Sequence, residues 1–578
     1  MAPTNQLQEV KIMLHGTAAS EGIGIGKVML IEEHSLEYTP RTVTDTEAES
    51  QRFKAAVDAF CYNTEKQAEN LRSSAGEKEA EILAGHIQII KDPYLSGEIE
   101  KLIADGQCAE SALEHMCDMF IAMFSAADDE LTKQRAADVR DIKSGVLGIL
   151  LGVNEIKVSD APKGTVLVAR ELTPSVTAGI VKENIAGIIT ETGGTTSHSA
   201  ILARALEIPA VLSVEGVASS LKNGDTVVVD GSEGAVIVNP DDNTVAEYSK
   251  KRDTFLAERK ELENYRGRET KSASGEVYEL FCNIGKPEDA VKAVDADGEG
   301  VGLFRTEFLF MDRTSIPTED EQFEAYKKAA LILKGKSLII RTLDIGGDKD
   351  IPYLGLEKEE NPFMGFRAIR YCLKNRELFK SQIKAILRAS AFGDIKIMFP
   401  LITTMDELRE GKKLVAECKA DLRNMGINFN ENIQVGVMVE TASAAVIADM
   451  LAKEADFFSI GTNDLTGYTM ACDRGNNDVS YLYSPLQPSV LRMIKRTIEC
   501  GVQNGISVGM CGEAAANKLM IPLLISFGLT EFSVSAPSVL NVRKIISTWT
   551  KEEADKVTEK VLEMSTQQEI VEYLKSVV

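Results

Sequence analysis

The chain has 578 residues, 44% of them hydrophobic, which is enough for about three or four globular domains. Its net charge of −24 and its lack of a Lys/Arg patch argue against a nucleic-acid partner. The nine cysteines form no CxxC pair, which predicts reduced thiols. No apolar run reaches the ~20 residues of a membrane-spanning helix, and the first ten residues lack a signal-peptide pattern. We therefore expect a cytoplasmic protein without membrane insertion.

The first patterned segment, residues 16–31, is rich in glycine and superficially resembles a phosphate-binding loop. Its glycine spacing does not fit a Walker loop, and Val28 stands where that loop has Ser or Thr. We therefore expect a strand or turn of a sheet here, and no ATP site.

Residues 36–149 are predicted to form a helical bundle inserted into another domain. From about residue 44, apolar residues such as Phe53, Phe60, Val139 and Val146 recur at helical spacing, and glycine is sparse. Strand-like runs resume after the insertion, at 165–168, 186–190 and 225–230. The simplest arrangement is a compact α/β domain formed by residues 1–35 and 150–240 together.

A histidine stands at a strand-to-helix turn of this α/β domain. The run GGTTSHSAILAR (193–204) follows the apolar strand and leads into a predicted helix, with Thr196 or Ser197 as its N-cap. Backbone N–H groups at a helix start favour an anion. His198 is therefore a candidate acceptor of a phosphoryl group, whereas an unremarkable capped helix is the alternative.

The second half of the chain predicts a (β/α)₈ barrel at 271–578, after a charged linker helix at 241–270. Eight strand-like runs alternate with amphipathic helices, whereas an open doubly wound sheet gives no reason for eight units. The runs are 277–282, 300–304, 338–341, 395–399, 433–439, 457–460, 507–510 and 531–534.

Charged and polar residues follow several of these strands, at the end of the barrel where active sites form. They are Arg305, Arg341, Glu440, Asn463, Asp464 and Cys511, with Arg474 after the sixth strand. Arginines bind carboxylate or phosphate oxygens, and two carboxylates suit Mg²⁺. A cysteine there can exchange a proton with carbon, although a packing role would be the favoured interpretation if it stood alone. This set predicts a magnesium-bound substrate that carries phosphate and carboxylate, such as phosphoenolpyruvate.

With these residues in place, the chain resembles enzyme I of the bacterial sugar phosphotransferase system over nearly its full length. The resemblance rests on GGTTSHSAILAR, RAADVRDI, GLFRTEFLFMDR, RTLDIGGDK, NPFMGFRAIR, RASAFGDIKIMFP, GVMVET, FFSIGTNDLTGYT, DRGN and GMCGE, in that order. It implies that His198 carries the phosphoryl group, that Thr177 orients it and that Cys511 protonates the enolate.

The resemblance also implies the ligands and partners. Phosphoenolpyruvate would be held by Arg305, Arg341, Asn463, Asp464 and Arg474, and Mg²⁺ by Glu440 and Asp464, with Lys349 and Arg367 as weaker candidates near the phosphate. The inserted bundle would dock the phosphocarrier protein HPr, and the barrel would form a homodimer. Because one histidine must serve two sites, we predict a swivel through residues 240–270.

Three positions depart from the family's pattern, namely Thr195, Ala442 and Gly467, and they bear on rate rather than on the named groups. Two other functions stay open. A dikinase would carry a large ATP-binding portion ahead of the histidine domain, whereas a non-catalytic regulator would have lost a charge or the nucleophile.

Overall fold

The computed structural model describes residues 12–31, 36–74, 77–126, 130–153, 158–177, 179–194, 197–311, 313–347, 349, 351–473 and 476–578. The chain divides into two compact units, Met1–Arg259 and Lys260–Val578. The division falls within helix α9 (Asp242–Leu262), in the segment predicted as a linker. The two units are described separately below.

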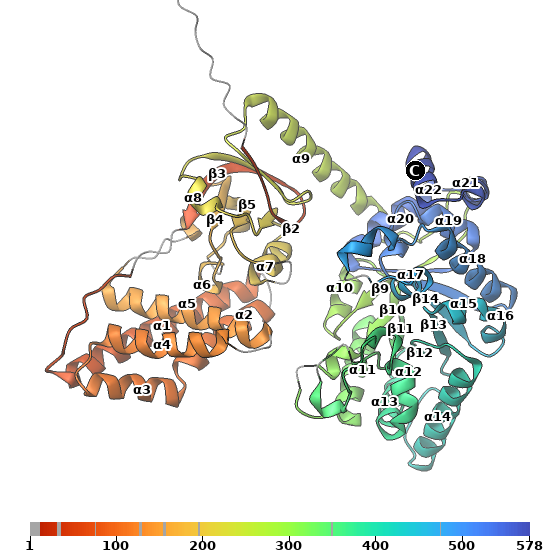
Figure 1. The fold of residues 1–578 in the computed structure, drawn as a ribbon, viewed down its shortest axis with the longest axis horizontal. Helices are drawn as coiled ribbons and strands as arrows, with labels where there is room; N and C mark the ends of the chain where they lie inside the picture. Colours follow the sequence, from red (N-terminus) through yellow and green to blue (C-terminus); the bar gives the residue numbers. More distant parts are fainter. Residues whose placement is uncertain are drawn as a thin grey trace, which may run out of the picture. The chain divides into compact units, whose positions relative to one another are not determined.

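An eight-stranded mixed sheet forms the α/β part of the first unit (Figure 1). Its strand order is β1-β8-β7-β3-β4-β5-β6-β2. Strands β3 to β6 run parallel to one another, and the remaining pairs are antiparallel. The strands are β1 (Ile12–His15), β2 (Thr17–Ser20), β3 (Ile23–Ile31), β4 (Thr165–Ala169), β5 (Ile185–Thr190), β6 (Ala210–Leu212), β7 (Thr226–Asp230) and β8 (Ala235–Val238). The sheet thus joins chain from both sides of the bundle, as predicted.

The glycine-rich segment is part of this sheet, as the sequence predicted. Its glycines allow close backbone packing, because a Cβ on Gly24 would lie 2.0 Å from the carbonyl oxygen of Ala186. A Cβ on Gly26 would lie 2.1 Å from the carbonyl oxygen of Gly164. These residues need glycine for sheet packing. Short helices complete this part, namely α6 (Pro174–Thr177), α7 (His198–Leu206) and α8 (Val217–Ser220).

Five helices lie between β3 and β4 in the sequence, where the insertion was predicted. They are α1 (Thr46–Ser74), α2 (Glu77–Ile90), α3 (Pro93–Ala104), α4 (Ala109–Ser125) and α5 (Glu130–Leu151). Their apolar faces form one core that includes Phe53, Phe60, Val139 and Val146. Arg52 pairs with Glu49 (2.7 Å) and Glu110 (2.6 Å), so the two buried carboxylates carry a compensating charge.

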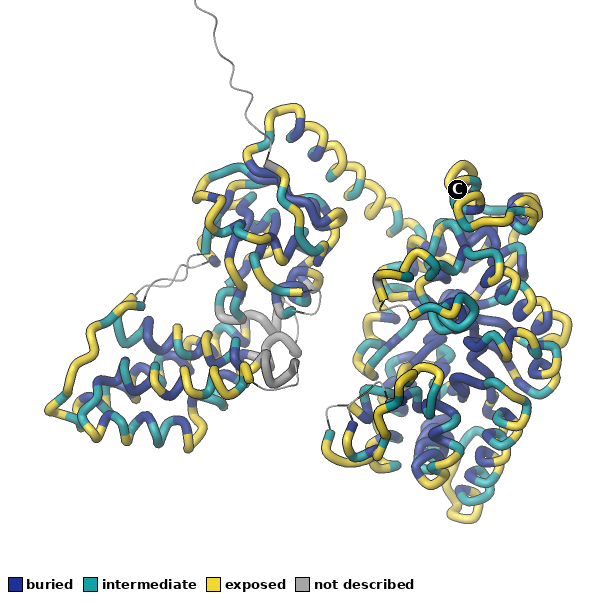
Figure 2. Tube along the Cα trace, viewed as in Figure 1, coloured by how far each residue is buried: buried dark blue, intermediate teal, exposed yellow. Residues whose placement is uncertain are grey.

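Helix α9 is mostly exposed, as Figure 2 shows, and its buried residues are Thr244 and Tyr248. A helix with so little apolar contact behaves as a solvated connection between domains.

The second unit contains the predicted barrel. Eight parallel strands close in the order β10-β11-β12-β13-β14-β15-β16-β9, inside a layer of helices (Figure 1). The strands are β9 (Glu279–Ile284), β10 (Gly300–Arg305), β11 (Ser337–Arg341), β12 (Ile395–Phe399), β13 (Val435–Val439), β14 (Phe457–Gly461), β15 (Ser507–Cys511) and β16 (Glu531–Val534). Each overlaps its predicted run, which confirms the barrel.

Helices follow the strands along the chain. They are α10 (Asp289–Asp295), α11 (Glu319–Leu333), α12 (Ala368–Lys374), α13 (Arg376–Ala389), α14 (Met405–Asn424), α15 (Ala442–Val446), α16 (Ala448–Leu451), α17 (Thr462–Met470), α18 (Pro488–Gln503), α19 (Ile521–Phe527), α20 (Val539–Thr548), α21 (Lys551–Glu563) and α22 (Gln567–Val577). A large apolar core lies between these helices and the strands. None of the helices in the described ranges is long and apolar enough to cross a membrane.

Candidate functional site

Residues at the ends of five barrel strands come together at the carboxyl end of the barrel. Arg305, Arg341 and Cys511 are the last residues of β10, β11 and β15, and Glu440 directly follows β13. Asp464 lies in the first turn of α17, which begins directly after β14. Because the strands are parallel and the barrel is closed, all these strand ends lie at one end of the unit.

Three carboxylates form a compact cluster there. One oxygen each from Asp344, Glu440 and Asp464 lies within 4.8 Å of the others. Glu440 is 2% exposed, and its Oε1 accepts a hydrogen bond from the Leu401 N–H at 2.6 Å. Burial, with Asp464 and Asp344 nearby, raises the pKa of Glu440 well above its ordinary value. Hard oxygen donors grouped in this way are the ligand set that Mg²⁺ or a similar cation prefers.

Asp344 is the member of this cluster that the sequence analysis did not assign. Its carboxylate lies between two arginines, 3.0 Å from Nη1 of Arg341 and 2.7 Å from Nη2 of Arg367. Burial favours the neutral acid, but the two guanidinium groups hold the pKa of Asp344 below its ordinary value. The available signal was its place in RTLDIGGDK, three residues after Arg341.

The two arginines are largely buried, and each has one nitrogen atom without a hydrogen-bond partner among the described residues. Arg341 also pairs with Glu307 at 2.8 Å, and Arg367 lies 3.6 Å from Asp464. Within the described ranges, Nε of Arg341 and Nη1 of Arg367 are buried without a hydrogen-bond partner. Unpaired buried N–H donors are costly, so they indicate a place for an anionic ligand. Arg367, predicted as a weaker candidate, is thus as closely packed into the site as Arg341.

Arg305 differs from these two arginines. It is exposed, and no ion pair or hydrogen bond joins its side chain to another described residue. Burial raises the pKa of Cys511, and the positive charge of Arg305 partly offsets that rise. Arg305 is thus placed to meet a ligand from the solvent side.

Cys511 is a buried thiol, 3% exposed. Burial raises its pKa to about 11, although the Ser459 hydroxyl, which donates to Sγ at 3.5 Å, opposes that effect. The thiol also donates a hydrogen bond to the Ile460 carbonyl oxygen, 3.7 Å from Sγ. Cys511 is therefore held as a protonated thiol at the carboxyl end of its strand.

Three other barrel residues were predicted to belong to the site, namely Asn463, Lys349 and Arg474. Asn463 is half-buried at the start of α17, and its carbonyl oxygen accepts a hydrogen bond from the Tyr483 hydroxyl at 3.0 Å. Lys349 is exposed, and its charge lowers the pKa of Asp344. Arg474 lies outside the described residues.

His198 is the first residue of helix α7 in the other unit. The side chain of Ser197 caps this helix by accepting from the Ala200 N–H at 3.3 Å, which confirms one of the two predicted caps. Thr177, at the end of α6, is 1% exposed. The histidine thus begins a capped helix, where free backbone N–H groups favour an anion.

The structure describes two of the three positions that depart from the family pattern. Ala442 begins α15 directly after its N-cap, Thr441. A Cβ on Gly467 would lie 3.3 Å from the Cys472 carbonyl oxygen, so a larger residue there would need some rearrangement. Thr195 lies outside the described residues.

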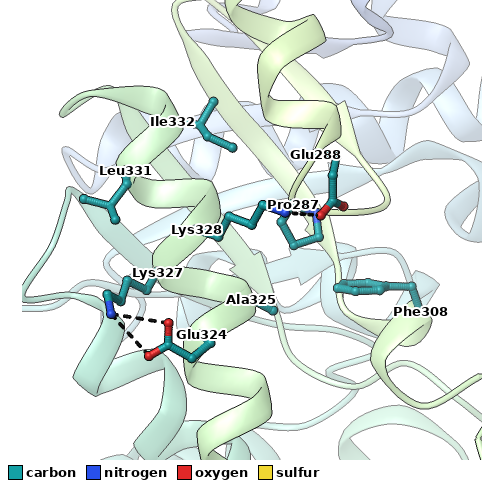
Figure 3. A pocket seen from close by; sticks show the side chains of 9 residues that line it. All are labelled: Pro287, Glu288, Phe308, Glu324, Ala325, Lys327, Lys328, Leu331 and Ile332. Atoms are coloured by element: carbon teal, nitrogen blue, oxygen red, sulfur yellow. Dashed lines mark hydrogen bonds and ion pairs between the residues drawn. The ribbon is translucent and has the colours of Figure 1, made fainter. Parts of the chain in front are cut away.

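A groove with a cavity volume of about 770 Å³ lies elsewhere on the barrel unit (Figure 3). Helix α11 forms one side, and the segments after β9 and β10 contribute Pro287, Glu288 and Phe308. Its lysines are paired within the groove, Lys328 with Glu288 at 2.5 Å and Lys327 with Glu324 at 3.2 Å. None of the predicted site residues lines it.

Three models of phosphoenolpyruvate-utilising enzymes match the chain. They are the N-terminal domain at residues 15–135, the mobile domain at 161–234 and the phosphoenolpyruvate-binding domain at 259–550. Among solved structures, an NMR structure of an enzyme I fragment shares 37% identity and covers 42% of this chain and 99% of its own, with a TM-score of 0.38.

Full-length relatives are more informative. The chain is 46% identical to the phosphoenolpyruvate-protein phosphotransferase of Bacillus subtilis, over 98% of this chain and 99% of that protein. It is 45% identical to the Listeria innocua protein of the same name, over 97% and 98%. For the Staphylococcus carnosus protein the identity is 44%, over 97% and 98%. The chain therefore belongs to the phosphoenolpyruvate-protein phosphotransferases, the enzyme I family.

Proposed function

We propose that this chain transfers the phosphoryl group of phosphoenolpyruvate to His198 and then to HPr, and releases pyruvate. This reaction is the first step of sugar uptake by the phosphotransferase system. One observation carries the proposal: a carboxylate cluster lies beside buried arginines whose Nε or Nη1 atom lacks a protein partner. That combination suits a small ligand with phosphate and carboxylate groups, bound together with a cation.

Glu440 and Asp464 would hold Mg²⁺, and Asp344 is a third available carboxylate. The donor set fits, because the three oxygens lie within 4.8 Å of one another and hard cations prefer such ligands. When bound there, Mg²⁺ supplies positive charge that offsets the negative charge of the phosphate oxygens.

The arginines would orient the substrate. Arg341 and Arg367 are fixed by Asp344, so their unpaired nitrogens are already aimed when the substrate enters. Arg305 and Arg474 would complete the anion site, and Asn463 would donate its amide. Phosphoryl transfer needs mainly such positioning and charge neutralisation from a protein.

Cys511 would protonate the enolate carbon as pyruvate forms. Its pKa of about 11 keeps the thiol protonated at neutral pH, so the proton is present when the phosphoryl group leaves. The acceptor would be the His198 ring, with Thr177 as its orienting neighbour. The exposed α9 helix would allow the phosphohistidine domain to swivel between the barrel and HPr.

The remaining proposals concern assembly. We expect domains at 1–35 with 150–240, at 36–149, and at 271–578, with 241–270 as the linker. The 36–149 bundle would dock HPr. The barrel would form a homodimer, which is supported by exposed apolar side chains such as Met364 (64% exposed) and Met450 (51%).

The test uses the purified chain with labelled phosphoenolpyruvate and Mg²⁺, without ATP. We expect acid-labile phosphate on the wild type, none on His198→Ala, and transfer to HPr in a chase. Binding of phosphoenolpyruvate without label would contradict the proposal and favour a regulator. Label that appears only with ATP would instead indicate a dikinase.

A further inference from the structure

A glutamine side chain joins the segments that follow β10 and β11 to each other. Gln382 lies in the middle of helix α13 and is 0% exposed. It is not a member of the carboxylate cluster, and the sequence analysis did not assign it to the site. A buried amide has two N–H donors and an acceptor to satisfy, so its partners show which parts of the chain it holds together.

The donor and acceptor atoms of this amide all have partners. Oε1 of Gln382 accepts a hydrogen bond from the Leu343 backbone N–H at 2.9 Å. Its Nε2 donates to Oγ1 of Thr306 and to the hydroxyl of Tyr326, both at 3.2 Å. A backbone N–H can only donate, so the amide oxygen must face Leu343 and the NH₂ group must face the two hydroxyls. The amide therefore has one orientation.

Thr306 extends this contact to β11. Its hydroxyl accepts from Gln382 and donates to the backbone carbonyl oxygen of Arg341 at 3.0 Å. The Tyr326 hydroxyl, on α11, accepts from Gln382 and donates to Oε1 of Gln322 at 3.4 Å. These side chains tie α11 and α13 to the carboxyl ends of β10 and β11. A buried network whose members each have partners holds the segments that it joins rigidly.

The two backbone segments held in this way carry the carboxylates that bind Arg341. Thr306 directly precedes Glu307, whose Oε1 accepts from Nη2 of Arg341 at 2.8 Å. Leu343 directly precedes Asp344, whose Oδ2 lies 3.0 Å from Nη1 of the same guanidinium. The amide between the two segments therefore sets the separation of the two carboxylates.

This separation determines where the remaining nitrogen of Arg341 points. Its Nη1 and Nη2 are engaged by Asp344 and Glu307, whereas its Nε is buried without a hydrogen-bond partner among the described residues. A planar guanidinium that is held on two nitrogens cannot turn independently of its partners. A small shift of either carboxylate would therefore turn the Nε–H away from a ligand.

We infer that Gln382 is a positioning residue for the reaction and fixes Arg341 through the segments at Thr306 and Leu343, an inference that rests on the proposed function. It acts through Arg341 rather than on the substrate. Its amide keeps the two carboxylates at the spacing that the guanidinium requires, so the unpaired N–H is aimed before phosphoenolpyruvate binds. Loss of the amide should weaken binding even though every residue that meets the substrate is unchanged.

The test measures the binding of phosphoenolpyruvate with Mg²⁺ by titration calorimetry. All proteins carry His198→Ala, so that no turnover follows binding. Gln382→Met keeps a side chain of similar length and removes the amide, and the affinity should fall about tenfold or more. The control Ser390→Ala removes a buried hydroxyl that directly follows α13 and donates to the Leu387 carbonyl oxygen. Its affinity should match that of the His198→Ala parent.

A double-mutant cycle shows whether Gln382 acts through Arg341. Glu307→Gln removes the charge of one carboxylate that fixes the guanidinium, so it should weaken binding by itself. Adding Gln382→Met should cause little further loss, because the orientation that the amide maintains is already lost. Thr306→Val removes the hydroxyl between Gln382 and the Arg341 carbonyl oxygen, and it takes the place of Gln382→Met if that variant fails to fold.

The other outcomes separate the two proposals. Parent-like affinity in Gln382→Met and Thr306→Val would overturn the positioning role. Losses that multiply in the double variant would overturn it too, and so would an equal loss in Ser390→Ala, since both indicate a general effect of reduced stability. A His198→Ala parent that does not bind phosphoenolpyruvate would contradict the proposed function itself, and the positioning role with it.

Discussion

The two ends of the barrel interior each bury a glutamate, but in opposite surroundings. Glu440, at the carboxyl end, lies among two other carboxylates, with Arg341 and Arg367 close by. Glu531, at the amino end, has its carboxyl group beside Gly302 and Gly509, and its Oε1 lacks a hydrogen-bond partner among the described residues. Both pKa values are raised, first by burial and then by neighbouring carboxylates.

This difference shows that a raised pKa alone does not define a role. At the carboxyl end, several negative groups share a small volume with arginines, an arrangement that a cation and an anionic substrate together would neutralise. At the amino end, Glu531 is buried, and the nearby charges of Glu279 and Lys396 act on its pKa in opposite directions. The same side chain is thus suited to ligand binding in one place, whereas in the other it is a buried acid that keeps its proton near neutral pH.

The largest expected effect comes from Glu440→Gln. Loss of a metal-binding carboxylate should slow phosphohistidine formation by about a thousandfold, roughly 4 kcal/mol. Mg²⁺ should also no longer raise the thermal midpoint of the variant. Glu531→Gln is the matched control, because the same substitution at the other end should leave the Mg²⁺-dependent shift unchanged. An unchanged shift in Glu440→Gln would remove Glu440 from the metal site.

Asp344→Asn tests the charge balance at the carboxyl end. It leaves Arg341 and Arg367, with side chains 12% and 8% exposed, without their shared counter-ion. Removing one partner of a buried ion pair costs about 3–5 kcal/mol, so the barrel should unfold at lower denaturant concentration. The affinity for phosphoenolpyruvate should fall as well, because the arginines lose their fixed orientation. A variant with wild-type stability and affinity would contradict this positioning role.

Much of the barrel could be predicted from sequence, because its buried parallel strands are short apolar runs, as in 395–399 and 457–460. The predicted site followed from the same pattern, since the carboxyl ends of such strands meet at one end. Asp344 was missed because it lies beyond its strand and is recognised only by its contacts with Arg341 and Arg367. Glu531 was missed because its inward direction depends on Gly302 and Gly509, which are distant in sequence.

Glu531, at the amino end, should make the stability of the folded chain depend on pH. Glu531 keeps its proton in the folded chain up to about pH 8, whereas the unfolded chain loses it near its ordinary pKa. Stability from this group is therefore present at low pH and is lost as the pH rises through about 8. The wild type should lose roughly 4 kcal/mol relative to Glu531→Gln between about pH 5 and pH 9. Parallel denaturation curves for the two proteins would contradict the raised pKa.

The smallest expected effect lies between the two ends, at Ser459. Its hydroxyl donates to the Cys511 Sγ at 3.5 Å and lowers the pKa of a thiol that burial raises to about 11. Ser459→Ala removes this donor, so the pKa of Cys511 should rise by up to about one unit, roughly 1 kcal/mol. The pH dependence of Cys511 alkylation measures it, with Cys472 in the same sample as an internal reference. A fall in the pKa would mean that the hydroxyl stabilises the thiol rather than the thiolate, which would contradict the role of Ser459 as a donor to Cys511.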